Sequence, residues 1–273
     1  NSIGLQGRVD RLNPVGLYAT AARQTVSTVR EDKVTQRSLG FWAQNETRWT
    51  PWFRSVQGLR ADAYDFDVDS SLAANSGQAS DQMVTPKLSL IFGPWQKTEF
   101  YLNYGHGFHS NDARGTTIKV DPADGVTPVQ SVKPLVRTRG HEIGIRSEPL
   151  PGWRSTLSLW QLDAASELLF VGDAGTTEAS RPSRRHGVEW TNLYVVADWL
   201  AIDADLAWSH ARFRDHDPVV GDHIPGAVTT TANISLTLDH LGPWFGALRL
   251  RYFGPRPLIE DDSVRSSASA LTN

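Results

Sequence analysis

Apolar and polar residues alternate with a period of two along most of this chain. Residues 227–239 alternate most regularly, because Ile234, Leu236 and Leu238 are separated by Ser235 and Thr237. In an extended strand, a period of two places alternate side chains on opposite faces. The pattern therefore predicts long β-strands with one apolar and one polar face.

Five short turns between these strands contain a tryptophan. The tryptophans are Trp52, Trp95, Trp153, Trp199 and Trp244. The spacings between them are 43, 58, 46 and 45 residues, and each interval holds an ascending strand, a polar loop and a descending strand. An earlier turn is expected at residues 11–15, which include Asn13 and Pro14. It lacks a tryptophan but fits the same alternation of ascending and descending strands. The repeating unit is therefore a long hairpin.

The hairpin repeat predicts about thirteen strands. They span residues 3–10, 16–28, 34–49, 53–67, 83–92, 98–107, 136–147, 154–172, 184–194, 201–213, 227–239, 245–253 and 264–273. Two long polar loops at residues 70–82 and 108–135, together with a turn at residues 173–177, are expected at the end opposite the tryptophans.

Strand length and turn length favour a membrane-spanning barrel over a soluble sandwich or propeller. The predicted strands run roughly 9 to 15 residues, whereas sandwich strands usually run about 5 to 6. The connections are short at the tryptophan end and long at the other end, as in barrels whose long loops face outward. The indoles lie where an interfacial aromatic belt would be. A propeller blade needs four short strands, whereas each interval here holds two long ones.

The polar face of the strands contains charged residues at mid-strand positions. They are Arg60, Asp62, Glu142, Arg146, Arg249 and Arg251. Such charges would cost several kcal/mol each if they were buried without partners in an apolar core. A watery or plugged lumen removes this cost, so we expect the opposite, apolar face to contact outer-membrane lipid.

The composition narrows the class of protein further. The 273 residues have a net charge of −3 and no run of Lys or Arg, so no nucleic-acid binding is expected. Cysteine is absent, which excludes disulfides, cysteine zinc sites and thiol catalysis. No stretch approaches the roughly 20 apolar residues of a membrane helix. The mean hydropathy of −0.35 still suits a barrel, because its apolar residues occupy every second position.

Four segments resemble the barrel of TonB-dependent outer-membrane receptors. They are residues 104–115 (YGHGFHSNDARG), 166–175 (SELLFVGDAG), 183–189 (SRRHGVE) and 250–258 (LRYFGPRPL). The resemblance implies an antiparallel up-and-down transmembrane β-barrel of 22 strands with a plugged lumen, in the outer membrane of a Gram-negative-type bacterium. It also implies TonB-driven uptake of a scarce extracellular solute, such as a ferric siderophore or another metal chelate. No enzymatic activity and no cofactor are implied.

The chain departs from the complete family pattern at both ends. It has no TonB box, no plug domain and no secretory signal at Asn1, and no final strand that ends in an aromatic residue. We therefore expect residues 1–273 to form a single partial barrel domain of about 13 strands that lacks the plug and the C-terminal strands. About 13 of 22 strands cannot close the barrel, so such a fragment would expose two unpaired edges and would not transport alone. TonB is expected to act through the missing plug region.

Candidate ligand-binding residues lie at a loop base and on the polar strand faces. The loop base contributes His106, His109, Asn111, Asp112 and Arg114, and the strands contribute Glu142, Arg146, Arg249 and Arg251. No metal site is expected, because histidines three residues apart across a strand-to-loop transition need not share a face. The inward arginines could attract an anionic ligand or pair with acidic residues of a plug, and the sequence leaves both open.

A passive porin-like channel and a membrane-embedded hydrolase are the alternative functions. A plug domain encoded upstream would distinguish a receptor from a porin. The Gly-x-Ser-x-Gly elbow of hydrolases is missing, and no spacing forces a Ser/His pair together. An enzyme is therefore not expected.

Overall fold

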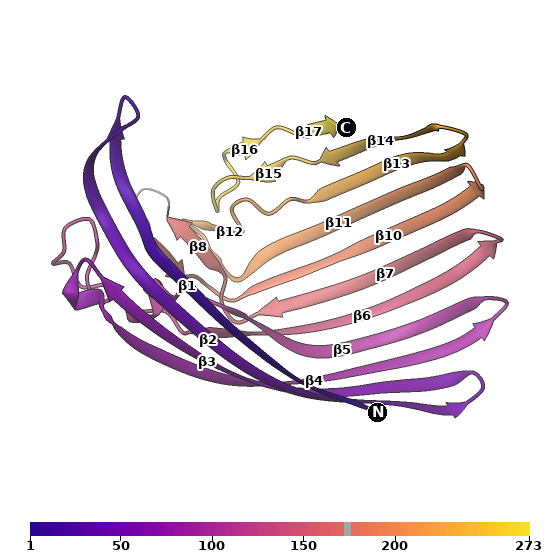
Figure 1. Cartoon of the computed structure of the whole chain (residues 1–273), viewed down its shortest axis with the longest axis horizontal. Helices are drawn as coiled ribbons and strands as arrows, with labels where there is room; N and C mark the ends of the chain where they lie inside the picture. Colours follow the sequence, from indigo (N-terminus) through magenta and orange to yellow (C-terminus); the bar gives the residue numbers. More distant parts are fainter. Residues whose placement is uncertain (172–175) are drawn as a thin grey trace.

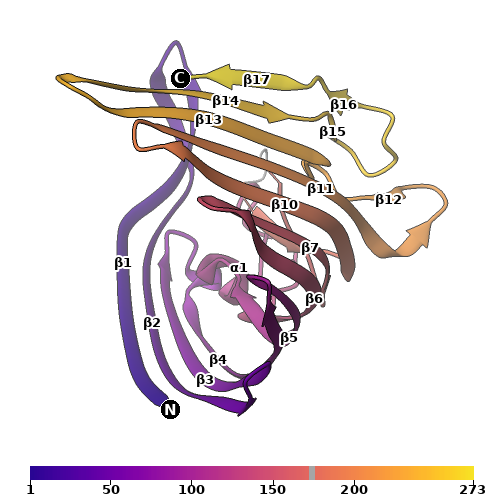
Figure 2. The ribbon, with the colours of Figure 1, turned by 90° about the vertical axis from the view of Figure 1, so that its right-hand side faces the viewer.

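The computed structural model describes residues 1–171 and 176–273. Most of them form one antiparallel sheet of 13 strands, which curves around a concavity (Figures 1 and 2). In spatial order the strands are β1 (Ser2–Ala21), β2 (Gln24–Thr50), β3 (Phe53–Ser70), β4 (Gly77–Trp95), β5 (Thr98–Ser110), β6 (Leu135–Leu150), β7 (Trp153–Ala164), β10 (Ser183–Ala197), β11 (Leu200–Asp217), β13 (Thr230–Leu241), β14 (Trp244–Phe253) and β17 (Ser269–Thr272), and β12 (Gly221–His223) pairs with β11. Each strand along this path pairs with the next one in chain order, as predicted for an up-and-down barrel. The strand order ends at β1 and β17, so the sheet is not closed.

Small elements lie outside the main sheet. Two short sheets pair β8 (Leu168–Val171) with β9 (Thr176–Ala179) and β15 (Arg256–Pro257) with β16 (Arg265–Ser266). The helices are η1, a 3₁₀ turn at Ala73–Asn75, and α1 at Ala113–Thr117. Among the described residues, no helix is both long and apolar enough to cross a membrane.

The first predicted turn is wrong. β1 continues through Asn13 and Pro14, and its pairing with β2 shifts register between Leu12 and Val15. Proline lacks the N–H of a ladder bond, but an edge strand such as β1 leaves one side unpaired and accommodates it. The hairpin instead turns at Ala22 and Arg23, whose positive φ angles of 50° and 66° suit a tight two-residue turn. β2 therefore includes residues 29–33, which lie between the second predicted strand (16–28) and the third (34–49).

Other strand predictions also differ from the structure. Residues 77–82, predicted as part of a polar loop, form the start of β4, and residues 227–229, predicted as strand, precede β13. The strand expected at residues 154–172 ends at Ala164, because β10 pairs with β7 only as far as Ser183 opposite Ala164. Leu168–Val171 forms β8 instead, and residues 173–175 of the predicted turn lie outside the described residues. Of residues 264–273, Ser269–Thr272 pairs with β14, and Asn273 exchanges backbone hydrogen bonds with Arg249.

The five tryptophan turns lie at one end of the sheet, as predicted. These hairpins lie side by side at the right-hand end of Figure 1. The rings of Trp52 and Trp95 stack with centroids 6.3 Å apart, and those of Phe53 and Phe92 with centroids 5.0 Å apart. This aromatic end matches the interfacial belt of membrane barrels.

The convex face of the sheet is apolar and uncovered. Ile234, Leu236 and Leu238 keep 47%, 38% and 37% of their surface exposed, and Leu248 and Leu250 keep 54% and 43%. No second layer of described residues lies over them. The apolar side of the strands is therefore free to contact hydrocarbon, as the alternation predicts.

Candidate functional site

The loop between β5 and β6 folds into the concavity, where Figure 2 shows α1. Asp112 caps α1 by accepting a hydrogen bond from the Arg114 N–H at 2.9 Å. Ala113, the first residue of α1, packs with Val34, Phe66 and Val68 in a buried apolar cluster. Because Phe66 and Val68 belong to the concave face of β3, this cluster holds the loop inside the mouth of the barrel.

A second contact holds the same loop at Asn75. The Asn75 side-chain oxygen accepts hydrogen bonds from the Lys119 and Val120 N–H groups at 2.9 and 3.0 Å, and its amide nitrogen donates to the Val120 carbonyl at 3.0 Å. The Thr117 hydroxyl donates to the Asn75 carbonyl at 2.9 Å. Asn75 is 1% exposed, so these bonds are shielded from water. The β3–β4 and β5–β6 loops are therefore joined.

A cavity of about 870 Å³ lies beside this folded loop. Its walls include Asp81, Asn111, Lys133 and Arg137. Asn111 is 4% exposed, and its amide nitrogen donates to the Lys133 carbonyl at 2.7 Å. Its buried side-chain oxygen has no hydrogen-bond partner among the described residues. A buried acceptor without a partner is rare and marks a place where a ligand donor or water would be stabilising.

The concave wall of β5 and β6 contains a polar network. Glu142 accepts hydrogen bonds from the Tyr101 hydroxyl and the Asn103 amide, both at 3.0 Å. Gly144 permits this arrangement, because a Cβ there would lie 2.3 Å from the Tyr101 ring. A cavity of about 430 Å³ adjoins the network and is also lined by Trp160. The wall therefore presents fixed polar groups to the lumen.

Arg146 lies nearer the tryptophan end of the same wall. Its guanidinium is 3.7 Å from Glu99, which also forms a two-pronged ion pair with Arg54 at 3.0 and 3.3 Å. The Arg146 side chain remains 61% exposed. It can therefore still donate hydrogen bonds into the lumen.

The structure separates the predicted site residues into three groups. Asn111, Asp112 and Arg114 lie together in the loop between β5 and β6, called the mouth loop below. Glu142 and Arg146 lie on the concave wall of β6. Arg249 and Arg251 lie on β14, with β7, β10, β11 and β13 between them and β6. These seven residues therefore line different parts of the concavity and do not form one constellation.

The two histidines lie on opposite sides of β5. His106 shares the convex side with Tyr104, whose hydroxyl is 3.0 Å from the His106 Nε2. His109 has the opposite parity, and its Nε2 is buried without a partner among the described residues. Within residues 1–171 and 176–273, no three His, Asp or Glu side chains are grouped to hold a metal ion.

Electrostatics favours a charged Asp112 at the start of α1. Burial raises its pKa, but the hydrogen bonds and charge of Arg114 outweigh that effect and lower the pKa below its usual range. The Arg114 guanidinium contacts both carboxylate oxygens, at distances from 2.6 to 3.2 Å. The mouth loop thus begins with a fixed ion pair.

Sequence reasoning missed Asn75, Lys133 and Asp81. Asn75 lies in a stretch of Ser, Ala, Asn and Gly residues, where nothing local distinguishes an anchor from a solvated loop residue. Its bonding partners are 42 to 45 residues away. Its role depends on the tertiary fold.

Comparisons with known proteins agree with this architecture. The family model described as TonB dependent receptor-like, beta-barrel matches residues 3–273. A comparison with curated proteins finds no match.

Several solved structures have a similar fold at low sequence identity. The copper transporter OprC is 15% identical, with 99% of this chain and 44% of that chain covered and a TM-score of 0.68. The ferric citrate transporter FecA in its unliganded form is 15% identical, with 99% and 42% covered and a TM-score of 0.68. The ferric yersiniabactin uptake receptor FyuA from Yersinia pestis is 16% identical, with 99% and 42% covered and a TM-score of 0.66. The chain thus spans less than half the length of each of these proteins.

Proposed function

Because this chain belongs to the TonB-dependent receptor family, a non-enzymatic family of the outer membrane, we propose that it forms part of the wall and mouth of a receptor for energy-coupled uptake. The cargo is a scarce extracellular solute such as a ferric siderophore or another metal chelate. Its strands separate lipid from lumen, and its long loops capture the solute. TonB acts through a plug domain encoded with the complete receptor.

The observation that supports this proposal most strongly is the folded loop in the barrel mouth. A passive pore needs an open mouth, whereas here α1 and its apolar cluster occupy the concave side. The cavity of about 870 Å³ beside the loop is within the range of small-molecule sites, roughly 300–1,000 Å³. Asn111 offers an unpartnered buried acceptor at its wall. These features suit capture of a solute before passage.

The low-identity structural neighbours support the choice of cargo class. Their names describe a copper transporter, a ferric citrate transporter and a ferric yersiniabactin receptor. All three handle a metal or a metal chelate. The loops that select a ligand vary most within a fold, so the particular chelate is a matter for experiment.

Uptake by cells that express the longest form encoded with this chain tests the proposal. Radiolabelled ferric citrate and a ferric catecholate are supplied to energised cells and to cells that lack TonB. We expect accumulation of at least one chelate that is lost without TonB. Equal accumulation in both strains would indicate a passive channel, and no accumulation of either chelate would contradict the proposed cargo class.

Asn111→Ala tests the mouth cavity in the same cells. Removal of the buried amide is expected to weaken chelate binding by roughly fivefold or more, since a hydrogen bond contributes about 1 kcal/mol or more. The matched control is Asn13→Ala, which removes an exposed amide from β1. Equal losses in the two variants would exclude the cavity as the site.

A further inference from the structure

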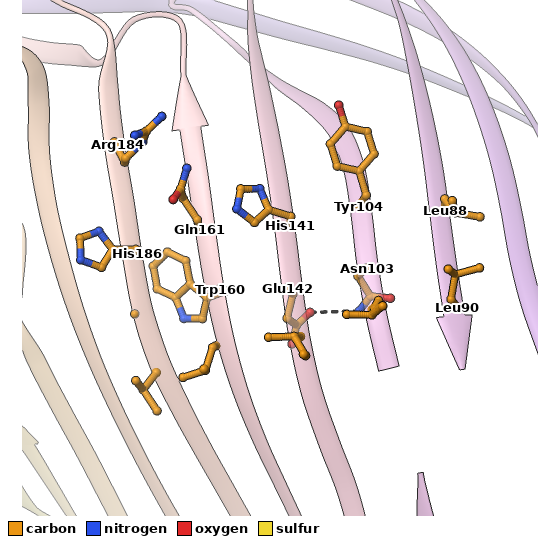
Figure 3. Close-up of a pocket in the computed structure, with 15 residues that line it drawn as sticks. Leu88, Leu90, Asn103, Tyr104, His141, Glu142, Trp160, Gln161, Arg184 and His186 are labelled. Atoms are coloured by element: carbon orange, nitrogen blue, oxygen red, sulfur yellow. Dashed lines mark hydrogen bonds between the residues drawn. The ribbon is translucent and has the colours of Figure 1, made fainter. Parts of the chain in front are cut away.

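The wall of the sheet divides between β4 and β5 at its loop end. Closer to the tryptophan turns the two strands are paired, and Leu88 of β4 lies beside Tyr104 of β5 (Figure 3). The last pair toward the loops is Lys87 with Gly105. Beyond it, Gly77–Pro86 of β4 pairs with β3, whereas the rest of β5 pairs with β6. A seam therefore separates the outer part of β4 from the β5–β6 hairpin.

Two features explain why the pairing stops at this point. Pro86 is the next residue outward on β4, and it has no N–H to donate to a neighbouring strand. The ring of Phe108 on β5 packs edge-on against Tyr64 of β3, with centroids 5.7 Å apart. Because β4 lies between these two strands, the contact indicates that the outer part of β5 bends inward from the wall.

The outer edge of β4 presents backbone groups to the seam. The Val84 carbonyl accepts a hydrogen bond from the Arg137 guanidinium at 3.1 Å, so it points toward β6. Backbone groups of alternate residues point to the same side of a strand, so those of Gln78 and Ser80 also face the seam. Among the described residues, no backbone-to-backbone hydrogen bond joins residues 77–86 to a segment other than β3. Such an edge can pair with another strand.

Most of this edge lies outside the membrane. β4 contains 19 residues, from Trp95 at the tryptophan end to Gly77. A tilted strand crosses the hydrocarbon in about 9–11 residues, so about eight residues at the Gly77 end project beyond the outer interface. Long loops mark the extracellular end of a barrel. The edge is therefore accessible to a partner outside the cell.

The cavity of about 870 Å³ beside the mouth loop adjoins this edge and favours an anionic occupant. Asp81, Lys133 and Arg137 line it. Both oxygens of the Asp81 carboxylate accept backbone N–H groups, from Gln82 at 2.8 Å and from Leu135 at 3.3 Å. Lys133 and Arg137 are exposed, so their charges can attract an anion.

We propose that Gly77–Pro86 is a strand-addition site for an extended, acidic segment of an extracellular protein. The segment pairs with the edge of β4 that faces the seam, and its carboxylates contact Lys133 and Arg137. Main-chain hydrogen bonds provide the affinity in this mode of recognition, and alternate side chains provide the specificity.

The mouth loop favours another chain as the occupant of this edge. The buried cluster around Ala113 and the hydrogen bonds of Asn75 hold the loop in the mouth. The β5–β6 hairpin is therefore not free to return to the wall and close the seam. A bound segment fills the cavity proposed for the solute, so the two occupants exclude each other.

Selection of displayed peptides tests the proposal. The longest form encoded with this chain is purified into phosphatidylcholine nanodiscs and exposed to random ten-residue peptides displayed on phage. We expect enrichment of Asp and Glu together with β-branched residues. An enriched peptide is then synthesised with N-methyl groups on alternate amides, in each of the two possible phases. One phase should weaken binding at least roughly tenfold and the other should leave it unchanged, because only alternate amides face β4.

Equal binding of the two methylated peptides, or no enrichment at all, would overturn the proposal. The measurement uses neither TonB nor a chelate. Its result is therefore independent of the uptake assay.

Matched variants locate the site. Ser80→Pro removes one N–H that faces the seam and should weaken peptide binding at least roughly fivefold, whereas Ser80→Ala keeps the N–H and should bind as the parent protein does. Lys133→Gln should weaken binding of the acidic peptide, and Lys33→Gln, which removes an exposed charge from β2, should not. Heat-modifiable gel mobility verifies that each variant is folded. Undiminished binding to folded Ser80→Pro, or equal losses in the two lysine variants, would contradict this site.

Discussion

Glu142 shows how a single carboxylate organises the lumenal wall. It satisfies two donors from the neighbouring strand, the Tyr101 hydroxyl and the Asn103 amide. In a half-buried position, a donor left without its acceptor costs more than the bond itself contributes. The wall at this level therefore depends on Glu142 more than on either of its partners.

We predict that Glu142→Ala lowers the free energy of unfolding by about 1–3 kcal/mol, because two donors lose their acceptor. Tyr101→Phe should cost about 1 kcal/mol, because it removes donor and bond together. Glu142→Gln keeps an acceptor and serves as the control. Urea titration of the protein in micelles measures all three, and a larger loss for Tyr101→Phe than for Glu142→Ala would refute this ranking.

Asp112 makes the start of α1 sensitive to acid. Its pKa in the folded protein is lowered, so its contribution is fully present above the ordinary carboxyl pKa of about 3.9 and is lost as pH falls through the lowered value. Hydrogen exchange of residues 111–118 should therefore be equally protected at pH 7 and 5 and less protected below about pH 4. Asp112→Asn retains a cap without the titration. An acid loss of the same size in this variant would exclude Asp112 as its source.

Strand β3 faces lipid on its convex side and the mouth loop on its concave side. Phe66 is fully buried beneath α1 on the concave face, whereas Leu59 is 54% exposed on the convex face. Phe66→Ala should cost about 3–5 kcal/mol of local packing and loosen the loop. Leu59→Ala should leave the loop in place, because it faces lipid.

Limited trypsin digestion distinguishes the two β3 variants. The mouth loop contains Arg114 and Lys119 as cleavage sites, whereas the Lys133–Pro134 bond resists trypsin. We expect faster cleavage there in Phe66→Ala and the parental rate in Leu59→Ala. Equal rates in both variants would show that the buried cluster does not hold the loop.

The alternation in sequence predicted the strands well, because a period of two determines which side chains share a face. Most of the strand predicted at residues 227–239, which the structure begins at Thr230, and the five tryptophan turns could be predicted without tertiary information. The first hairpin was mispredicted because Asn13 and Pro14 resemble a turn locally, and only their position on an edge strand explains why the strand continues. α1 was not predicted, because five residues make no periodic signal and the helix depends on Phe66 and Val68.

The candidate site was less predictable than the fold. Its individual residues could be proposed from the loop base and the polar strand faces, but their grouping could not. Arg249 and Arg146 are separated by the curvature of the whole sheet. Asn75 acts through a loop more than 40 residues away.

The architecture of the whole sheet implies that successive side chains along a single strand alternate between lipid and the lumen. The chain has no cysteine, so Leu236→Cys and Thr237→Cys each provide one site for a spin label. In a bilayer, the label at position 236 should be more accessible to oxygen, and the label at position 237 to a water-soluble nickel chelate. Identical accessibilities at the two positions would contradict a lipid-facing convex surface.

The hydrogen bonds at Asn75 couple two loops mechanically. A solute that displaces the segment around Lys119 is also expected to displace the β3–β4 loop, because the side chain and carbonyl of Asn75 accept hydrogen bonds from Thr117, Lys119 and Val120 of that segment. We therefore expect the two loops to move together. A displacement of the β5–β6 loop should then reach the β3–β4 loop directly through Asn75.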